Sequence, residues 1–321
     1  TFRGEGPYLD GRRPSFVEFH REIERDLARR DFTMNAIAVD IESDEWVDPF
    51  GGVEDIQRRT VRCVGNARER FREDGLRPLR AVRFVSTLSF SVEADTRAAL
   101  GAEPETFQAV AWERKRIEIE KLLVGPAARS ALALLEESSL LAGLAPELQG
   151  GSDDLEALDR HEPDPWIRLI EWGLRRGVYG EALGTIATRW KSSVDVRQRL
   201  ERGSAAFVAF ERALPDAVQW RRWLSIHGLR AANDVCALLA ARGEEPEVLR
   251  SVLNPTPPHR IQDLEIDGND ILELGVQGPE VGRVLQTLLE QVLEKPERNR
   301  RDWLLREAHR LSTGSAVPED P

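Results

Sequence analysis

The chain has 321 residues, of which 41% are hydrophobic and 31% charged, and its net charge is -11. That length is enough for two or more domains with sizeable cores, and because no run of about 18 apolar residues occurs, no membrane-spanning helix is expected. The only two cysteines, Cys63 and Cys236, are far apart in the sequence, which indicates neither a disulfide framework nor a zinc site. These properties favour a cytoplasmic protein.

The first 55 residues have the composition of strands and turns. The opening stretch "TFRGEGPYLDGRRPSFVEF" is rich in glycine and proline and ends in an alternating run at residues 15–19, which predicts a loop leading into a strand. "FTMNAIAVDI" (32–41) is a short apolar segment, and "EWVDPFGG" (45–52) predicts a strand that ends in a turn. This part is expected to contain a small β-sheet.

Beyond Val53 the pattern changes to long amphipathic helical segments. Stretches with glycine or proline interrupt it at "GPAAR", "LAPELQGGSDD", "HEPDPW", "LNPTPPH" and "GVQGPE". The expected fold class is therefore α+β and predominantly α, with a small α/β part followed by several helical subdomains.

The stretch "REDGLRPLRAVRF" (72–84) places two acidic residues ahead of arginines that recur at every third position. Asp74, Arg77, Arg80 and Arg83 would share one broad face of a helix, with the apolar residues turned inward. Two interpretations are open. The face is either a ladder of intrahelical ion pairs, each worth about 0.3–0.5 kcal/mol, or it holds a ligand that needs a carboxylate and several guanidiniums.

The charge distribution bears on the same question. Residues 58–83 contain nine arginines and three acidic residues, a local net charge of +6 in an acidic protein. Such a basic island is typical of a localised phosphate-binding groove. The alternative explanation is compositional, because only four of the 45 basic residues in the chain are lysines.

Five stretches occur together in the order and spacing of one protein family. They are "LARRDFTMNAIAVD" (27–40), "WVDPFGGVEDIQRRTVRCVG" (46–65), "RFREDGLRPLRAVRF" (70–84), "WERKRIEIEKLL" (112–123) and "LEIDGNDILELGVQGPEVGRVLQTLLEQVL" (264–293). Together they resemble the class II tRNA nucleotidyltransferases, which are the CCA-adding enzymes and their poly(A) polymerase relatives. The resemblance implies the C-terminal part of a nucleotidyltransferase head at residues 1–55, a neck at 56–125, a helical body at 126–255 and a tRNA-binding helical tail at 256–321.

The resemblance implies a base-reading role for the acid–arginine stretch. Asp74 and Arg77 would read the incoming base, Glu73 would orient them, and Arg80 and Arg83 would support the triphosphate or the fold. Cytosine and adenine both present an amino donor beside a ring-nitrogen acceptor, which suits a carboxylate next to a guanidinium. Uracil and guanine carry a carbonyl oxygen in place of that amine, so they would leave Asp74 facing an acceptor and be rejected.

By the same resemblance, Arg30, Asp31 and Asn35 face the sugar and phosphates of the nucleotide. Asp31 would accept a hydrogen bond from a ribose hydroxyl, Arg30 would donate to phosphate or sugar oxygens, and Asn35 would brace the loop. The alternative is a surface ion pair ahead of a buried segment. "GPYLDGRRP" (6–14) resembles the family's flexible loop, which is implicated in the switch from C to A addition.

The family's metal-binding carboxylates, an Asp-x-Asp preceded by Gly-Gly-x-x-Arg, are not found in this sequence. In the family, two Mg²⁺ ions held there would activate the 3′-hydroxyl of tRNA and stabilise the triphosphate charge. We therefore expect the Mg²⁺ ligands to lie upstream of Thr1, the chain to be a fragment without the metal site, and no catalytic or metal-binding residue within it. Asp40-Ile41-Glu42 is similar to the Asp-x-Asp motif, but it follows the "RRD" stretch at residues 29–31 and so lies on the wrong segment.

The expected function is template-independent addition of CMP, CMP and AMP to the 3′ end of tRNA, with CTP and ATP as substrates. Two alternatives stay open: an A-adding tRNA nucleotidyltransferase, and a catalytically inactive RNA- or nucleotide-binding module. The expected partners are tRNA, CTP and ATP, without a membrane, and the sequence predicts no particular oligomeric state.

Overall fold

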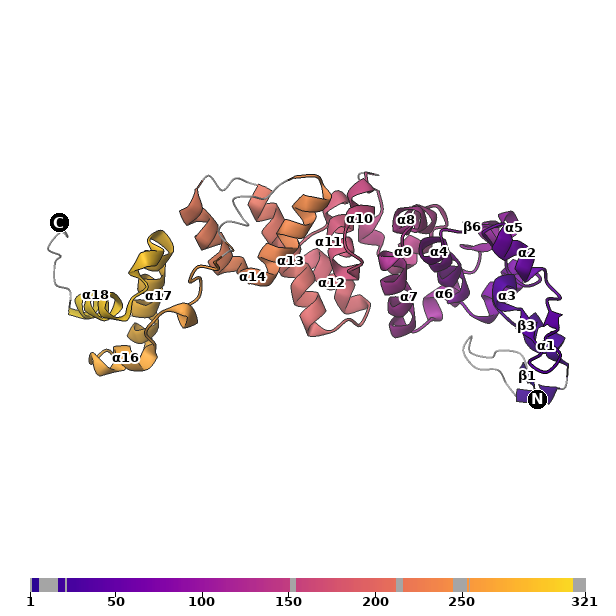
Figure 1. Ribbon diagram of the computed structural model, residues 1–321, viewed down its shortest axis with the longest axis horizontal. Coiled ribbons are helices and arrows are strands. Elements are labelled where there is room, and N and C mark those ends of the chain that lie inside the picture. The colour runs from indigo at the N-terminus through magenta and orange to yellow at the C-terminus, as the bar shows by residue number, and fades with distance from the viewer. Residues whose placement is uncertain are drawn as a thin grey trace. The chain divides into compact units, whose positions relative to one another are not determined.

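A computed structural model of the chain describes residues 2–5, 17–20, 22–150, 154–211, 216–244, 253 and 255–313. The chain divides into two compact units, Thr1–Ser204 and Ala205–Pro321, and each is described by itself. Helices dominate both units (Figure 1), so the expected class, α+β and predominantly α, is confirmed. Within the described ranges, no helix is long and apolar enough to cross a membrane. The loop expected at residues 6–14 lies outside the described residues.

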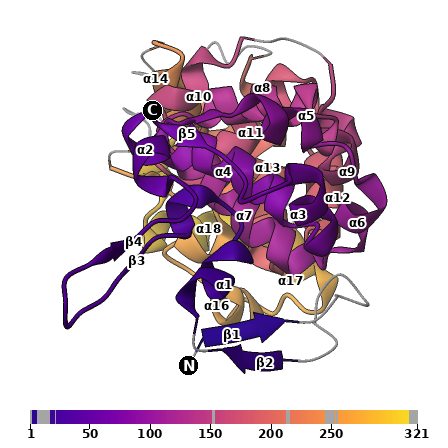
Figure 2. The ribbon, with the colours of Figure 1, turned by 90° about the vertical axis from the view of Figure 1, so that its right-hand side faces the viewer.

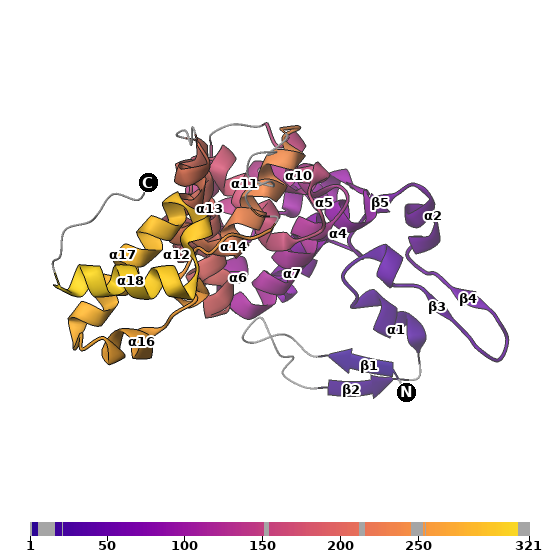
Figure 3. The ribbon, with the colours of Figure 1, turned by 60° about the vertical axis from the view of Figure 1, so that its left-hand side comes forward.

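Short strands in the first unit form three separate two-stranded sheets. They are β1 (Phe2–Glu5) with β2 (Val17–His20) and β3 (Ala38–Val39) with β4 (Trp46–Val47), both antiparallel, and β5 (Thr60–Val61) with β6 (Ser91–Val92), which is parallel. The single small sheet expected here is thus divided into pairs. Figures 2 and 3 show the β3–β4 hairpin projecting away from the helices of its own unit.

The helices of the first unit are mostly short and amphipathic. They are α1 (Ile23–Ala28), α2 (Gly52–Gln57), α3 (Ala67–Glu73), α4 (Arg77–Leu88), α5 (Ala94–Ala99), α6 (Pro104–Ala109), α7 (Trp112–Val124), α8 (Ala128–Glu137), α9 (Leu140–Leu144), α10 (Glu156–Arg160), α11 (Pro165–Arg175), α12 (Glu181–Arg189) and α13 (Val194–Glu211), which contains the boundary between the units. Single 3₁₀ turns cover Thr33–Asn35 and Pro146–Leu148.

Helix α4 is the central helix around which the candidate site is built. It packs against both α7 and α8. Its apolar side chains recur at intervals of three, and Leu79, Val82 and Val85 are buried, as expected for the core-facing stripe of an amphipathic helix. The arginines of the same helix lie beside this stripe and are thereby held at fixed positions.

The acid–arginine stretch at 72–84 does not form one helix, so the expectation that Asp74 shares a helix face with the arginines is wrong. Helix α3 ends at Glu73 and α4 begins at Arg77. Asp74 is extended, with φ -142° and ψ 108°, and its Oδ1 accepts a hydrogen bond from the Leu76 amide (3.0 Å). The physical reason is Gly75, because a Cβ there would lie 2.2 Å from the Thr106 carbonyl oxygen.

Helix α4 begins beyond this turn. Leu76 occupies the N-cap position, and Pro78 lies in the first turn, where its missing N–H leaves no intrahelical hydrogen bond unmade. The result is a tight turn between two helices, with the carboxylate of Asp74 at its centre and Arg77 at its exit.

The second unit consists of helices with their own apolar core. Among the described residues after α13, its elements are α14 (Ala217–Ala241), a 3₁₀ turn at Ile261–Asp263, α16 (Gly268–Glu273), α17 (Pro279–Glu294), a 3₁₀ turn at Pro296–Arg298 and α18 (Arg301–Thr313). Helix α14 bends at Gly228, which has φ 81° and interrupts the helical hydrogen-bond ladder. Buried apolar side chains of α16, α17 and α18 belong to one cluster that includes Leu288, Val292 and Leu304.

Candidate nucleotide-binding site

The residues expected to bind a nucleotide all lie in the first unit, on the segment after α1 and around the α3–α4 turn. The structure brings them into three groups. Asp31 and Asn35 join Arg80 and Arg83, Glu73 joins Arg77, and Asp74 joins a residue of α7. Arg30 points instead to α1, as described below.

Asp31 is the hub of the first group. Its Oδ1 accepts hydrogen bonds from the Phe32 amide and from Asn35 Nδ2, both at 2.9 Å. Its Oδ2 lies 2.8 Å from both Nε and Nη2 of Arg80. A carboxylate offers about four acceptor positions, so the protein itself occupies those of Asp31, whose side chain is only 12% exposed. Contact with a ribose hydroxyl would require one of these bonds to be exchanged.

Arg80 and Arg83 are tied together by a buried acid on α7. Glu118 Oε1 lies 3.4 Å from Arg80 Nη1, and Glu118 Oε2 lies 2.5 Å from Arg83 Nε. Burial alone would lower the pKa of Arg80, but Asp31 and Glu118 raise it above its usual value. Burial lowers the pKa of Arg83 although Glu118 opposes the change. Both arginines are therefore built into the frame of the site.

Arg77 is buried, contrary to the expectation that it lies on a face opposite the apolar residues. Its Nη1 donates to the Arg70 carbonyl (2.9 Å) and to Glu73 Oε2 (2.7 Å), and its Nη2 donates to the Arg29 carbonyl (3.1 Å). A guanidinium has five N–H groups, so these three bonds fix its direction and leave part of its donor edge uncommitted within the described residues. The side chain is 11% exposed.

Asp74 is only partly satisfied. Beyond the bond from the Leu76 amide to Oδ1, its Oδ2 accepts a hydrogen bond from Arg114 Nη2 at 2.8 Å. The backbone carbonyl of Asp74 accepts from the Arg77 amide at 3.0 Å, which closes the turn. The two side chains expected to read a base therefore leave the same turn, one acidic with spare acceptor positions and one basic with spare donors.

Arg30 belongs to a different ion-pair group at the end of α1. Its Nη2 lies 2.8 Å from Asp26 Oδ2, and Arg29 pairs with the other oxygen of Asp26. Burial would raise the pKa of Asp26, but hydrogen bonds from Arg30 and Arg29 lower it below its usual value. The side chain of Arg30 is still 47% exposed, against 12% for Asp31, so Arg30 is the more open of the two to an incoming phosphate or sugar.

The basic island at 58–83 is mostly neutralised by acids that come from outside it. Ion pairs engage eight of its nine arginines, with Glu54, Asp55, Glu93, Glu103, Glu73, Asp31 and Glu118 as partners. Glu73 alone of these acids lies within the island. The local surplus of charge seen in the sequence is therefore largely balanced in the fold, and a phosphate would have to exchange with existing pairs.

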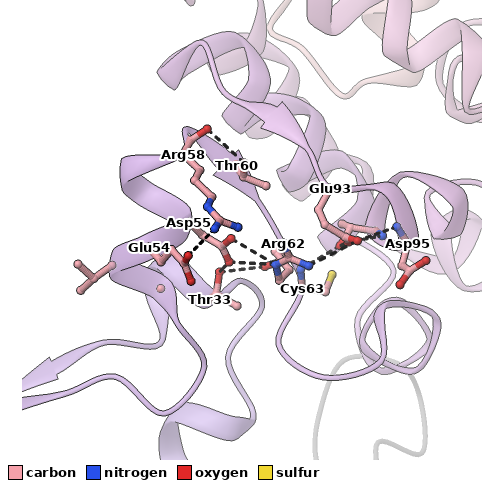
Figure 4. Close-up of polar contacts among 12 residues, drawn as sticks. Thr33, Glu54, Asp55, Arg58, Thr60, Arg62, Cys63, Glu93 and Asp95 are labelled. Carbon is pink, nitrogen blue, oxygen red and sulfur yellow. Dashed lines mark hydrogen bonds and ion pairs between the residues drawn. The ribbon is translucent and has the colours of Figure 1, made fainter.

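A second polar network holds the segment 31–35 at Thr33 (Figure 4). Buried Asp55 accepts a hydrogen bond from Thr33 Oγ1 (2.7 Å) and from Arg62 Nε (3.1 Å), and Arg62 also pairs with Glu93 (3.5 Å). Gly52 comes so close that a Cβ would lie 2.2 Å from the Thr33 carbonyl oxygen. The "DPFGGVED" stretch thus fixes the position of the "RRD" stretch.

Four residues that sequence reasoning left out of the site complete it: Arg70, Arg114, Glu118 and Asp55. A usable signal existed for two of them. Arg114 and Glu118 are four residues apart in "WERKRIEIEKLL", so they share one helix face. The contacts by which Arg70 and Asp55 hold the site, to the Ala28 carbonyl and to Thr33, are long-range, and no local pattern predicts them.

The described residues contain no group of three or more His, Cys, Asp or Glu side chains that could hold a metal ion. Asp40, in the near mimic of the metal motif, accepts hydrogen bonds from the amides of Glu42 (2.8 Å) and Ser43 (3.2 Å) in the β3–β4 hairpin. These bonds lower the pKa of Asp40. Its carboxylate therefore stabilises a turn, and the described residues do not fit a two-Mg²⁺ site.

Two family profiles match the first unit. The profile described as "Poly A polymerase head domain" matches residues 1–62, and the one described as "Probable RNA and SrmB- binding site of polymerase A" matches residues 89–150. The four-part division at residues 55, 125 and 255 stays a prediction.

Similar proteins and structures extend this match over nearly the whole chain. The CCA-adding enzyme of Geobacillus thermodenitrificans is 37% identical over 95% of this chain and 78% of its own length, and that of Bacillus cytotoxicus is 34% identical over 94% and 77%. The crystal structure of the Bacillus stearothermophilus CCA-adding enzyme in complex with CTP superposes with a TM-score of 0.76 at 33% identity, covering 98% of this chain and 80% of that one. The family resemblance seen in the sequence is confirmed, and the chain belongs to the CCA-adding enzymes, which are tRNA nucleotidyltransferases.

Proposed function

We propose that the α3–α4 turn of this chain reads the base of incoming CTP and ATP during addition of CMP, CMP and AMP to the 3′ end of tRNA. The observation that carries the proposal is the pair of side chains leaving that turn. Asp74 keeps acceptor capacity beside its bond to Arg114, and Arg77 keeps donor capacity beside its bonds to Glu73 and the Arg29 carbonyl. A carboxylate and a guanidinium match the amine and ring nitrogen shared by cytosine and adenine.

Selection follows from the cost of an unpaired group in a confined site. Uracil or guanine would place a carbonyl oxygen against the Asp74 carboxylate, so two acceptors would face each other without a proton between them. The reading requires no template strand, because the amino acids themselves supply the complementary edge. Glu73 contributes by holding Arg77 at 2.7 Å, and Arg114 contributes by holding Asp74.

The sugar and phosphates would lie toward Arg30, Asp31 and Asn35. Arg30 is half exposed and can exchange its pair with Asp26 for a phosphate or sugar oxygen. Asp31 and Asn35 are bonded to each other, so they set the shape of the segment, and Asp31 would meet a ribose hydroxyl only by exchanging a bond. Arg80 and Arg83 contribute positive potential to the triphosphate side from their fixed positions against Glu118.

Mg²⁺ belongs to this proposal only as the ion that family members use. Bound Mg²⁺ would activate the attacking hydroxyl and stabilise the triphosphate charge. Since the described residues do not fit such a site, no step of the reaction is assigned to a metal held by them. The partners proposed are CTP, ATP and tRNA, and the proposed location is the cytoplasm.

The test is nucleotide selection by the intact enzyme on tRNA that lacks its 3′ CCA. Incorporation of C, C and A, with UTP and GTP rejected, is the expected result. Incorporation of A alone, and only on tRNA that already ends in CC, would instead identify an A-adding enzyme. Tight binding of CTP and ATP without any incorporation would identify an inactive nucleotide-binding module. Loss of selection in Asp74→Ala, with CTP still incorporated, would tie the selection to the α3–α4 turn.

A further inference from the structure

Three arginines of α3 and α4 hold the end of α1 and the segment that follows it, at residues 28, 29 and 31. The bonds run from Arg70 Nη1 to the Ala28 carbonyl (3.2 Å), from Arg77 Nη2 to the Arg29 carbonyl (3.1 Å) and from Arg80 Nε to Asp31 Oδ2 (2.8 Å). The segment 28–31 carries the residues proposed to face the sugar and phosphates, and the arginines surround the turn proposed to read the base. The two reading elements are therefore joined by direct bonds.

Arg70 contacts both reading elements through one guanidinium, as Arg77 does, but Arg70 is not one of the residues proposed to touch the nucleotide. Its Nη2 pairs with Glu73 Oε1, while its Nη1 reaches the Ala28 carbonyl. Glu73 in turn offers its second oxygen, Oε2, to Arg77 Nη1 at 2.7 Å, and the carbonyl of Arg70 accepts from the same Nη1 at 2.9 Å. The side chain of Arg70 is 19% exposed.

We propose that Arg70 is a positioning residue that determines nucleotide selectivity without touching the nucleotide. It holds Glu73 against Arg77 and ties that pair to the Ala28 carbonyl, so that Arg77 keeps the one direction in which it can donate to a base. The inference rests on the proposed base-reading role of Asp74 and Arg77. It adds a residue that acts on the base reader through Glu73 and the segment after α1.

The geometry of the guanidinium explains why this position needs arginine. Two N–H donors on separate nitrogens reach two acceptors at once, whereas an ammonium on a flexible stem is a single compact donor group. Without Arg70, one oxygen of Glu73 loses its partner, and the carboxylate can rotate away from Arg77. The base-reading guanidinium would then sample several directions, and discrimination between an amine and a carbonyl on the base would weaken.

The experiment compares kcat/KM for CTP and for UTP in the intact enzyme carrying Arg70→Met. The expected CTP-to-UTP ratio is about tenfold lower than in the wild type, which is the size expected for losing one charged hydrogen bond. Arg70→Lys should restore part of the ratio because it keeps one of the two bonds. A role in stability alone would reduce the active fraction and lower both rates equally, leaving the ratio unchanged.

The matched controls come from the same helix. Arg68 and Arg72 lie on α3 and both pair with Glu103, away from the segment 28–31, so Arg68→Met and Arg72→Met should keep the wild-type ratio. A fall in those variants as large as that in Arg70→Met would overturn the inference. If Arg70→Met does not fold, the CTP-to-UTP ratio of kcat/KM in Arg70→Lys and Arg70→Gln tests the inference in its place.

Asp74→Ala separates the two possible failures. If Asp74→Ala keeps the wild-type CTP-to-UTP ratio, the proposed base-reading function is wrong. If Asp74→Ala loses the ratio and Arg70→Met keeps it, the function stands and the positioning role of Arg70 is rejected.

Discussion

Asp31 and Asp74 are two carboxylates of the same site that the protein satisfies to different degrees. Asp31 receives the Phe32 amide, the Asn35 amide group and two nitrogens of Arg80, and its side chain is 12% exposed. Asp74 receives one donor on each oxygen and is 23% exposed. The two aspartates are therefore expected to have different roles.

The difference follows from where the two residues lie. Asp31 lies in a segment that is held between α1 and α4. Its carboxylate therefore accepts hydrogen bonds from backbone and side-chain groups of the protein. Asp74 lies in a turn whose backbone is fixed by Gly75 and by the amide of Arg77. Its side chain is therefore not needed to hold the backbone in place. A saturated carboxylate is expected to support the fold, and an unsaturated one to select a ligand.

The largest effect is expected from Asp74→Ala, on selectivity. The variant should lose discrimination of CTP over UTP and of ATP over GTP by about a thousandfold, because a site built around a buried polar pair rejects mismatched partners strongly. Its unfolding free energy should fall by no more than about 1 kcal/mol, since the Arg114 pair is partly exposed. Competition assays on tRNA lacking CCA measure the first quantity, and urea unfolding measures the second. Unchanged discrimination would contradict the assignment.

Asp31→Ala should affect stability more than selectivity, and should lower the unfolding free energy by about 3 kcal/mol. The substitution removes the hydrogen bonds of Asp31 and leaves Glu118, at 3.4 Å, as the remaining ion-pair partner of Arg80. Urea unfolding measures the loss, and Asp31→Asn is the matched control because the amide keeps the shape and one acceptor. The selectivity between CTP and UTP should change less than in Asp74→Ala. A stability change smaller than that of Asp74→Ala would show that the comparison is wrong.

Two neighbouring residues of α7 differ in a similar way, because Arg114 contacts the candidate site and Lys115 is buried in the core. Arg114 reaches Asp74, whereas Lys115 is 1% exposed and its Nζ lies over the rings of Trp112 (4.4 Å) and Phe107 (4.7 Å). Burial lowers the pKa of Lys115 to about 8. A buried lysine charge weakens the fold, although the two rings offset part of that cost.

Lys115→Met should therefore stabilise the protein at pH 7 by about 2 kcal/mol. Below pH 8 the lysine is charged in both states, and the folded state bears the full cost of burial. Between about pH 8 and the usual lysine pKa of about 10.4, the folded state releases its proton first, so the wild type gains stability as the pH rises. Urea unfolding at pH 7 and pH 10 should show the difference between variant and wild type becoming smaller. A difference that does not depend on pH would reject the buried charge as its cause.

Much of the fold could be predicted from the sequence because its elements are local and periodic. The apolar spacing of "LRPLRAVRF" indicated α4, and "EWVDPFGG" indicated β4 and its turn. The α3–α4 turn was missed because its cause is the approach of Gly75 to Thr106, which lies 31 positions further along the chain. Helical periodicity in "REDGLRPLRAVRF" continues across this turn, and the pattern alone gives no sign of the interruption.

The sequence proposed a set of site residues, which stays a prediction, but it could not give the bonds among them. The motifs placed Asp31, Asp74, Arg77 and Arg80 in one neighbourhood, where the structure also places them. The neutralisation of the basic island depends on acids such as Glu118 and Glu103, which lie outside the arginine-rich segment. Counting charges along the chain cannot reveal pairs that form only when distant helices pack.

Gly75→Ala tests whether the turn itself holds the carboxylate of Asp74 in place. Gly75→Ala would put a Cβ 2.2 Å from the Thr106 carbonyl oxygen, and because backbone cannot yield as a flexible side chain does, we expect a loss of about 2 kcal/mol. The matched control is Gly282→Ala in α17, where a Cβ would meet nothing within 4 Å and where alanine should add about 0.5–1 kcal/mol by favouring the helix. Urea unfolding of both variants should thus give changes of opposite sign.

Gly75→Ala should also weaken CTP binding, because displacing the turn from Thr106 moves Asp74 away from Arg114. Equal and positive changes in stability for the two variants would mean that the turn is not fixed by this contact, and that Asp74 is held by its side-chain bonds alone.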